Sequence, residues 1–138
     1  MSLKWMKSKV AAIIFVNDKK EILLCLRDDK PEIPYPNYWG LIGGHLEQGE
    51  TPFEALKRET MEEIGYDINE AVFLGSLDDE AENWVYIFHG KMDKKADELY
   101  LTEGQRLEFF DYERIMKLIN IPQPLLVFIE NNKEKIFC

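Results

Sequence analysis

The amino-acid sequence predicts an α/β fold in which helices pack against a mixed sheet. Three observations predict it: β-rich apolar runs recur along most of the chain, one strongly signalled helix interrupts them, and two helical stretches follow the last run. Strands and helices that each have one apolar face favour layers around a shared core. Because the 138 residues contain no repeat and no linker, we expect a single domain over residues 1–138.

The first predicted element is a β-hairpin. Residues 9–16 and 21–26 are β-rich apolar runs, and the polar tetrad 17–20 between them is typical of a turn. Residues 28–38 then contain three prolines among charged residues, which predicts a surface loop. Long loops of this kind often border a ligand.

The next predicted elements are a strand and a helix. Residues 39–46 predict a strand that breaks at Gly43-Gly44, where the backbone can approach another group closely. Thr51 is a natural N-cap for the helix, proline occupies the first helical position, and Glu54 completes a capping box. The glycine at position 65 predicts the end of this helix.

The rest of the chain predicts more strands and two further helices. Strands are expected at 68–77, 84–89, 99–102 and 106–110, and helices at 111–119 and 124–131. An acidic stretch, 78–83, connects the first two of these strands. This order completes the prediction of a mixed α/β domain.

Three glutamates share one face of the predicted central helix. Glu59, Glu62 and Glu63 stand at i, i+3 and i+4, so their carboxylates project over a single turn. A separate stripe is predicted to face the core: Phe53, Leu56, Thr60 and Ile64. An acidic face is ordinarily a solvated surface. Carboxylates gathered this closely are also the hard oxygen ligands that divalent cations prefer.

The charge balance excludes some partners. Lysine and arginine total 17 against 26 aspartates and glutamates, and the net charge of −9 repels nucleic-acid polymers and anionic lipid surfaces. A phosphorylated small molecule remains compatible with this charge if a bound cation neutralises part of it. Cys25 and Cys138 do not form a disulfide framework, and no apolar stretch is long enough for a membrane span. We therefore expect a soluble, cytoplasmic protein.

Fixed spacings around the helix point to one family. From Gly44 the chain continues as Gly44-x5-Glu50-x7-Arg58-Glu59-Thr60-Met61-Glu62-Glu63-Ile64-Gly65-Tyr66. This series resembles the signature box of the Nudix hydrolase family, also called MutT-like, G-x5-E-x7-R-E-U-x-E-E-x-G-U, where U is bulky and usually apolar. Every fixed position agrees. Thr60 replaces a more common aliphatic residue and Ile42 replaces a frequent proline, and neither change removes a predicted metal ligand.

The resemblance refines the fold to a Nudix-like α/β/α sandwich with a mixed sheet and a central catalytic helix. It implies hydrolysis of a diphosphate linkage in a nucleoside diphosphate derivative, with Mg²⁺ as the cofactor and Mn²⁺ as an alternative. Nucleoside triphosphates, damaged nucleotides, nucleotide sugars and dinucleotides all belong to this substrate class. The family also makes a homodimer an open expectation.

Two other functions stay open at this stage. One is a catalytically silent domain of the same fold that senses a ligand or binds a partner, although such domains usually carry a broken box. The other is an isomerase of isoprenoid diphosphates on a related fold, which needs its own cysteine and glutamate pair. Cys25 and Cys138 occupy unpromising positions for that reaction.

The resemblance assigns roles within the box. It makes Glu59 and Glu63 metal ligands, and Glu62 shares that coordination or acts as the base. The carbonyl of Gly43 completes the metal shell. Arg58 and Glu50 form an internal ion pair that braces the preceding loop against the helix.

Further residues outside the box are implied in catalysis and substrate binding. Glu103 is the first choice for a loop residue that takes a proton from water, and a solvent-exposed loop glutamate is the ordinary alternative. Other loop glutamates that could supply this base are Glu80, Glu82 and Glu98. Arg27 is expected to contact a phosphate, and Trp39 to stack on a nucleobase, although aromatic residues beside strands more often belong to the core. His45 and His89 receive no catalytic role.

Overall fold

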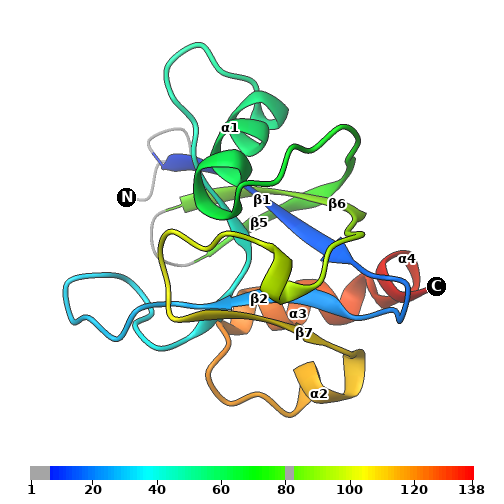
Figure 1. The fold of residues 1–138 in the computed structure, drawn as a ribbon. Coiled ribbons are helices and arrows are strands. Elements are labelled where there is room, and N and C mark those ends of the chain that lie inside the picture. The colour runs from blue at the N-terminus through cyan, green and yellow to red at the C-terminus, as the bar shows by residue number, and fades with distance from the viewer. Residues whose placement is uncertain (1–6, 80–82) are drawn as a thin grey trace.

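A computed structural model describes residues 7–79 and 83–138 (Figure 1). The strands are β1 (Ser8–Val16), β2 (Ile22–Leu26), β3 (Trp39–Gly40), β4 (Ile42–His45), β5 (Val72–Asp78), β6 (Asn83–Lys91) and β7 (Arg106–Phe110). The helices are α1 (Pro52–Ile64), α2 (Tyr112–Met116), α3 (Gln123–Asn131) and α4 (Lys133–Phe137), with a 3-10 turn at Ala96–Glu98. Among the described residues, no helix has the length and apolar character that a membrane span requires.

The strands form one mixed sheet. Its order is β3-β2-β1-β6-β5, with β4 also paired to β1 and β7 also paired to β2. β1 and β6 run parallel along their whole length, from Ser8 opposite Asn83 to Val16 opposite Lys91. The other pairs are antiparallel, including the predicted hairpin of β1 and β2.

Each face of the sheet carries its own apolar cluster. Because successive side chains of a strand point to opposite faces, β1 contributes Ala11, Ile13 and Phe15 to one cluster and Ala12 and Ile14 to the other. α1 covers the first face, whereas α2, α3 and α4 supply the second with Ile115, Leu125, Ile129 and Ile136. Helices therefore lie on both faces, which confirms the predicted α/β/α sandwich.

The sequence signals of α1 are realised in its geometry. The Thr51 hydroxyl accepts a hydrogen bond from the Glu54 backbone N–H at 3.2 Å, and the Glu54 carboxylate accepts one from the Thr51 N–H at 2.9 Å. Gly65 ends the helix in the left-handed conformation, with φ of 66°. Leu56 and Ile64 are buried against the sheet, so the predicted stripe faces the core. That contact fixes the rotation of the helix, and it places Glu59 and Glu63 beside the core-facing stripe, next to β4.

Three predicted strands differ from the structure. The strand predicted at 68–77 begins only at Val72, and the Ile68 carbonyl accepts a hydrogen bond from the Lys57 side chain at 2.7 Å instead of joining the sheet. The strand at 39–46 breaks at Leu41, and Gly43-Gly44 lies inside β4 opposite Ala12 and Ala11. The glycines belong there because β4 presses against β1, and a Cβ on Gly43 would overlap the Ala11 carbonyl. Residues 99–102 form no strand, because the N–H groups of Tyr100 and Thr102 bond to the end of α1 and that of Leu99 bonds to Ala96 in the 3-10 turn. The first terminal helix also ends earlier than predicted, at Met116.

Candidate active site

The acidic face of α1 lies against the glycine pair of β4. A Cβ on Gly44 would overlap the carboxyl group of Glu59, so the backbone of β4 and this side chain are as close as atoms allow. Glu59 is 20% exposed, whereas Glu62 is 59% exposed. The close approach that the sequence predicted at Gly44 therefore brings β4 to one of the predicted metal ligands.

Among the carboxyl groups where α1 meets β4, Glu63 has the most strongly shifted pKa. Its removal from water raises its pKa to about 8, and the negative charge of Glu59 adds to that effect. A hydrogen bond from the Gly43 backbone works in the opposite direction. Glu103 raises the pKa further and Arg27 lowers it. These five residues share one electrostatic environment, although they come from four separate segments of the chain.

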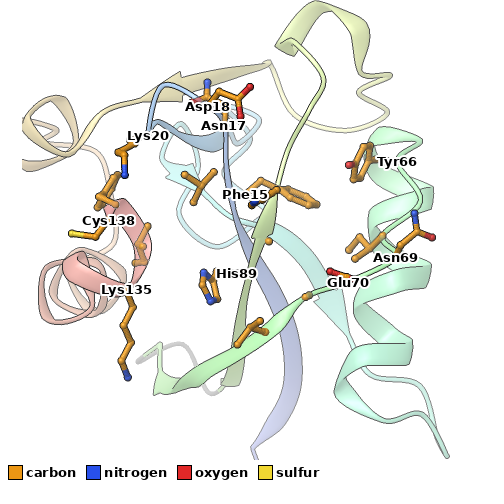
Figure 2. Close-up of a pocket in the computed structure, with 18 residues that line it drawn as sticks. Phe15, Asn17, Asp18, Lys20, Tyr66, Asn69, Glu70, His89, Lys135 and Cys138 are labelled. Carbon is orange, nitrogen blue, oxygen red and sulfur yellow. The ribbon is translucent and has the colours of Figure 1, made fainter.

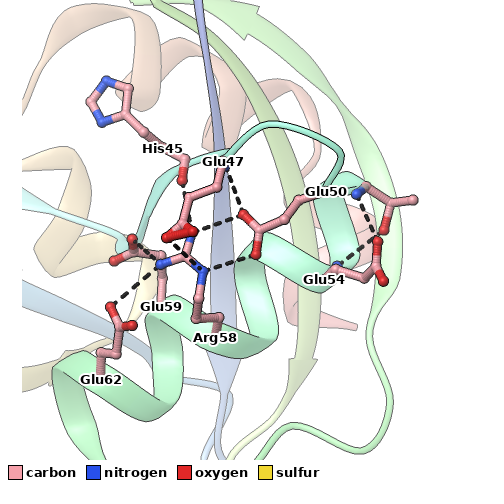
Figure 3. A network of polar contacts seen from close by, with 8 residues as sticks. His45, Glu47, Glu50, Glu54, Arg58, Glu59 and Glu62 are labelled. Atoms are coloured by element: carbon pink, nitrogen blue, oxygen red, sulfur yellow. Dashed lines mark hydrogen bonds and ion pairs between the residues drawn. The ribbon is translucent and has the colours of Figure 1, made fainter.

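Arg58 forms a network of hydrogen bonds that joins α1 to the segment before it (Figure 3). Its guanidinium group donates two hydrogen bonds to the Glu50 carboxylate, at 2.8 and 2.9 Å, and one to the His45 carbonyl at 3.0 Å. A further bond reaches Glu59 at 2.8 Å, and a longer one reaches Glu62 at 3.4 Å. The predicted pair of Arg58 and Glu50 is thus bidentate, and it ties the loop before α1 to the middle of the helix.

The ion pair also sets the charge state of Glu50. Two hydrogen bonds from Arg58, and one from the Glu47 backbone N–H at 2.7 Å, lower the pKa of Glu50 to about 2. Glu50 therefore stays ionised at any ordinary pH. Because Arg58 already compensates the charge of Glu50, this carboxylate joins the loop to the helix. Glu63, in contrast, is not part of that ion pair.

The carboxylates fit a divalent cation by their chemistry. Within residues 7–79 and 83–138, no three Asp, Glu, His or Cys side chains stand together in a ready-made metal cluster. Arg58 bonds to the Glu59 and Glu62 carboxylates. When both are ionised, Glu59 and Glu63 repel each other in a partly buried place. A cation relieves this repulsion, and hard oxygen donors are the ligands that Mg²⁺ selects.

The loop glutamates predicted as bases occupy different places. Glu103 lies in the loop before β7, and its charge acts on both Glu63 and the buried thiol of Cys25. Glu98 instead accepts a hydrogen bond from the Lys95 backbone N–H at 2.8 Å in the 3-10 turn. Glu80 and Glu82 fall outside the described residues. Of the two candidates in the described part of the chain, Glu103 is the one whose charge raises the pKa of Glu63.

Arg27 and Trp39, the two predicted substrate contacts, differ in their surroundings. Arg27 follows β2, is partly exposed, and donates a hydrogen bond to the Pro34 carbonyl at 2.9 Å. Its charge reaches Glu63. Trp39 is only 5% exposed and packs edge to face on Phe110, with ring centroids 4.8 Å apart. This placement supports a phosphate contact for Arg27 and gives no support to base stacking by Trp39, whose ring belongs to the core.

A hollow of about 640 Å³ lies elsewhere on the molecule (Figure 2). It is bounded by the turn after β1, residues 66–72, the end of β6 and α4. His89 lies near its centre, where burial and the charge of Lys135 lower the pKa of the imidazole. None of the α1 carboxylates lines this hollow. The carboxylates to which the sequence analysis assigned chemistry therefore lie outside this hollow, where α1 meets β4.

Contacts of the segment Tyr100–Gln105 were not predicted from the sequence. The Thr102 hydroxyl donates to the carbonyl oxygens of Glu62 and Glu63, about forty positions earlier in the chain. The Gln105 side chain donates to the Arg27 carbonyl. No spacing signals such long-range hydrogen bonds, and the polar residues there predicted only a break between strands.

A protein-family model matches the chain. The NUDIX domain model covers residues 6–131, which includes all of the signature box. An RNA pyrophosphohydrolase from Nitratiruptor sp. is 34% identical over 114 residues, which are 80% of this chain and 64% of that protein. An 8-oxo-dGTP diphosphatase from Proteus vulgaris is 32% identical over 71 residues, or 51% of this chain and 62% of that protein. The chain thus spans somewhat less than two thirds of the length of either relative.

Solved structures have the same fold. A MutT protein from Methanosarcina mazei Go1 superimposes with a TM-score of 0.82, covering 97% of this chain and 98% of that one at 22% identity. The ORF135 protein of Escherichia coli gives a TM-score of 0.72 over 97% of this chain, also at 22% identity. At these identities the likeness describes the architecture, and it agrees with the sandwich described above.

Proposed function

The chain belongs to the NUDIX family, and from this premise we propose that it is a diphosphohydrolase acting on a nucleoside diphosphate derivative. Residues 1–138 are taken as a single domain with this activity. One observation carries the proposal: Glu59 and Glu63, two carboxyl groups of the intact box, meet at the glycine pair of β4, where the charge of Arg27 acts on Glu63.

Each residue of this group has a role that its surroundings support. Glu59 and Glu63 would hold a divalent cation, with Glu62 and the Gly43 carbonyl completing the set of oxygen donors. Such a cation, when bound, neutralises phosphate charge and acidifies water. Mg²⁺ is the expected ion, and Mn²⁺ an alternative with the same preference for oxygen.

The remaining groups supply orientation and proton transfer. Arg27 would hold a phosphate oxygen of the substrate beside the carboxylates, because a guanidinium group pairs well with phosphate. Glu103 would take the proton of the attacking water, with Glu62 as the other candidate base. Arg58 and Glu50 keep the loop and the helix in register, so their loss is expected to weaken the site without deleting a reacting group.

The proposed substrate class contains several kinds of nucleotide derivative. Named relatives include enzymes for RNA and for 8-oxo-dGTP. A net charge of −9 disfavours contact with a long polyanion, yet a short 5′ end presents only its terminal phosphates. Nucleoside triphosphates, the damaged nucleotide 8-oxo-dGTP, nucleotide sugars, dinucleotide polyphosphates and a 5′-triphosphorylated oligoribonucleotide therefore form the test panel. The homodimer expected from the resemblance is a separate proposal, checked by light scattering.

The test measures release of orthophosphate, pyrophosphate and nucleoside monophosphate from each member of the panel, with Mg²⁺ and with a chelator. Wild type is compared with Glu62→Gln, which keeps the size of the side chain and removes its charge. We expect metal-dependent cleavage of at least one member and a lower rate in the variant. Binding of a panel member without any turnover would replace the hydrolase with the silent, ligand-sensing domain.

A further inference from the structure

The C-terminal end of α1 is capped by a distant segment of the chain. A helix leaves its last four carbonyl groups without partners inside the helix. In α1 all four accept hydrogen bonds. The Met61 carbonyl accepts one from the Gly65 N–H (3.0 Å), and the Ile64 carbonyl accepts one from the Tyr100 N–H (3.0 Å). The Glu62 carbonyl accepts one from the Thr102 hydroxyl (3.0 Å), and the Glu63 carbonyl accepts one from the Thr102 N–H (2.9 Å). The Thr102 hydroxyl also lies 3.2 Å from the Glu63 carbonyl. Thr102 thus bonds to the backbone of two residues whose side chains are predicted metal ligands.

The same segment is fixed at its other end to the strand that leads into Arg27. The Gln105 N–H donates to the Leu26 carbonyl at 2.8 Å, and the Gln105 side chain donates to the Arg27 carbonyl at 2.8 Å and to the Asn37 side chain at 2.9 Å. Gly104 has a φ of 97°, and a Cβ there would stand 2.7 Å from the buried sulfur beneath it. Residues 100–105, here called the strap, therefore join α1 to β2 and to the proline-containing loop.

Glu103 lies between these two attachments. Its neighbour Thr102 is anchored to α1, and Gly104 passes closely over β2, so the backbone on both sides of Glu103 is held. Among the described residues of the strap, Thr102 is the one whose side chain bonds to α1. If its hydroxyl were removed, the backbone bonds from Tyr100 to Ile64 and from Thr102 to Glu63 would keep the strap docked, but its side-chain attachment to the helix would be lost.

We propose that Thr102 is a positioning residue that sets Glu103 over the carboxylates of α1. This inference rests on the proposed function, because it takes Glu59 and Glu63 as the metal ligands and Glu103 as the base. Proton transfer depends steeply on the placement of the base. Loss of the Thr102 hydroxyl is therefore expected to lower kcat about tenfold, with little change in KM for the substrate.

The test compares Thr102→Val, which removes the hydroxyl at similar size, with Thr102→Ser, which restores it. Thr60→Val is the matched control, because it makes the same change in α1 at a hydroxyl that has no hydrogen-bond partner in the described structure. We expect kcat to fall in Thr102→Val alone, and to be recovered in Thr102→Ser. In a Glu103→Gln background, Thr102→Val should cause no further loss, since the residue through which it acts is already changed.

A second measurement does not depend on turnover. In protein labelled with ¹³C at glutamate carboxyl carbons, the Glu103 signal is identified by its absence in Glu103→Gln, and Mn²⁺ is added as a paramagnetic probe. We expect Mn²⁺ to broaden the Glu103 signal in wild type and in Thr102→Ser, and to broaden it much less in Thr102→Val. Broadening that is absent in wild type, or unchanged in Thr102→Val, would overturn the positioning role.

The two measurements separate the two proposals. Suppose that Mn²⁺ broadens the Glu103 signal in wild type but not in Thr102→Val, while the protein turns over no member of the panel. That result would support the positioning role of Thr102 and contradict the proposed hydrolase activity. Metal-dependent turnover with equal kcat and equal broadening in wild type and Thr102→Val would keep the hydrolase and remove the positioning role. A fall in kcat that is as large in the Glu103→Gln background as in wild type would show that Thr102 acts through another group.

Discussion

Raising the pH is expected to destabilise the metal-free protein through Glu63. Burial and the charge of Glu59 raise the pKa of Glu63 from 4.5 to about 8 in the folded state. The unfolded chain loses that proton near the ordinary value. Between these two values the folded state holds a proton that the unfolded state lacks, so the Glu63 contribution to the free energy of unfolding decreases as pH rises through this window and changes no further above about 8.

The size of the effect follows from the width of the window. The interval from 4.5 to about 8 corresponds to a loss of up to about 5 kcal/mol, at about 1.4 kcal/mol for each unit of pH. This is a large part of the ~5–15 kcal/mol that stabilises an ordinary domain. Mg²⁺ binds the ionised carboxylate and releases its proton, so the stabilisation by Mg²⁺ should be larger at about pH 9 than at about pH 6.

Urea unfolding between about pH 5 and about pH 9, with a chelator present, measures this slope. Glu63→Gln cannot titrate and should lack the Glu63 contribution, becoming more stable than wild type at the alkaline end. Glu54→Gln is the matched control, because glutamine still serves a capping box. Parallel pH dependences of wild type and Glu63→Gln would refute the buried, proton-binding state of Glu63.

Three further changes test other parts of the structure. Thr60→Val should raise the free energy of unfolding by about 1–2 kcal/mol, measured by urea unfolding, because the buried hydroxyl of Thr60 has no partner in the described structure; a loss of stability would show that it has one. Gly44→Ala should weaken Mg²⁺ binding at least about tenfold by calorimetry, since its Cβ would displace the Glu59 carboxyl group, and unchanged affinity would contradict the close packing. Arg58→Lys should lower both the melting temperature and the metal affinity, because one ammonium group cannot replace a bidentate pair with Glu50; a variant equal to wild type in both would remove the bracing role.

Local signals in the sequence predicted α1 and the hairpin well. Thr51, Glu54 and Gly65 act within a few positions of one another, so their caps can be read from neighbouring residues. The alternation of apolar residues along β1 likewise reflects burial on two faces. The intact box brought the carboxylates and the Glu50–Arg58 pair into the prediction together, through the resemblance.

The features that the sequence analysis did not predict depend on contacts between segments that are distant in the chain. Residues 99–102 have strand-like composition, yet the N–H groups of Tyr100 and Thr102 bond to the end of α1, and no neighbouring residue in the sequence indicates that contact. Trp39 was expected to stack on a nucleobase, although an aromatic residue beside a strand more often belongs to the core. The structure places its ring in the core, packed on Phe110, and this contact between distant segments is not visible in the sequence. The close approach at Gly43-Gly44 was predicted, but the strand was expected to break there; the pair instead lies inside β4, where the approach of β4 to β1 and to α1 requires glycine.

We propose that Glu59 and Glu63 hold the cation for hydrolysis of a diphosphate. The first measurement is the Mg²⁺-dependent rate of product release from the preferred panel substrate in wild type, Glu59→Gln and Glu54→Gln. We expect a rate at least about 100-fold lower in Glu59→Gln, with a raised Mg²⁺ requirement, and a wild-type rate in Glu54→Gln. A Glu59→Gln protein as active as wild type at the same Mg²⁺ concentration would show that Glu59 does not hold the cation.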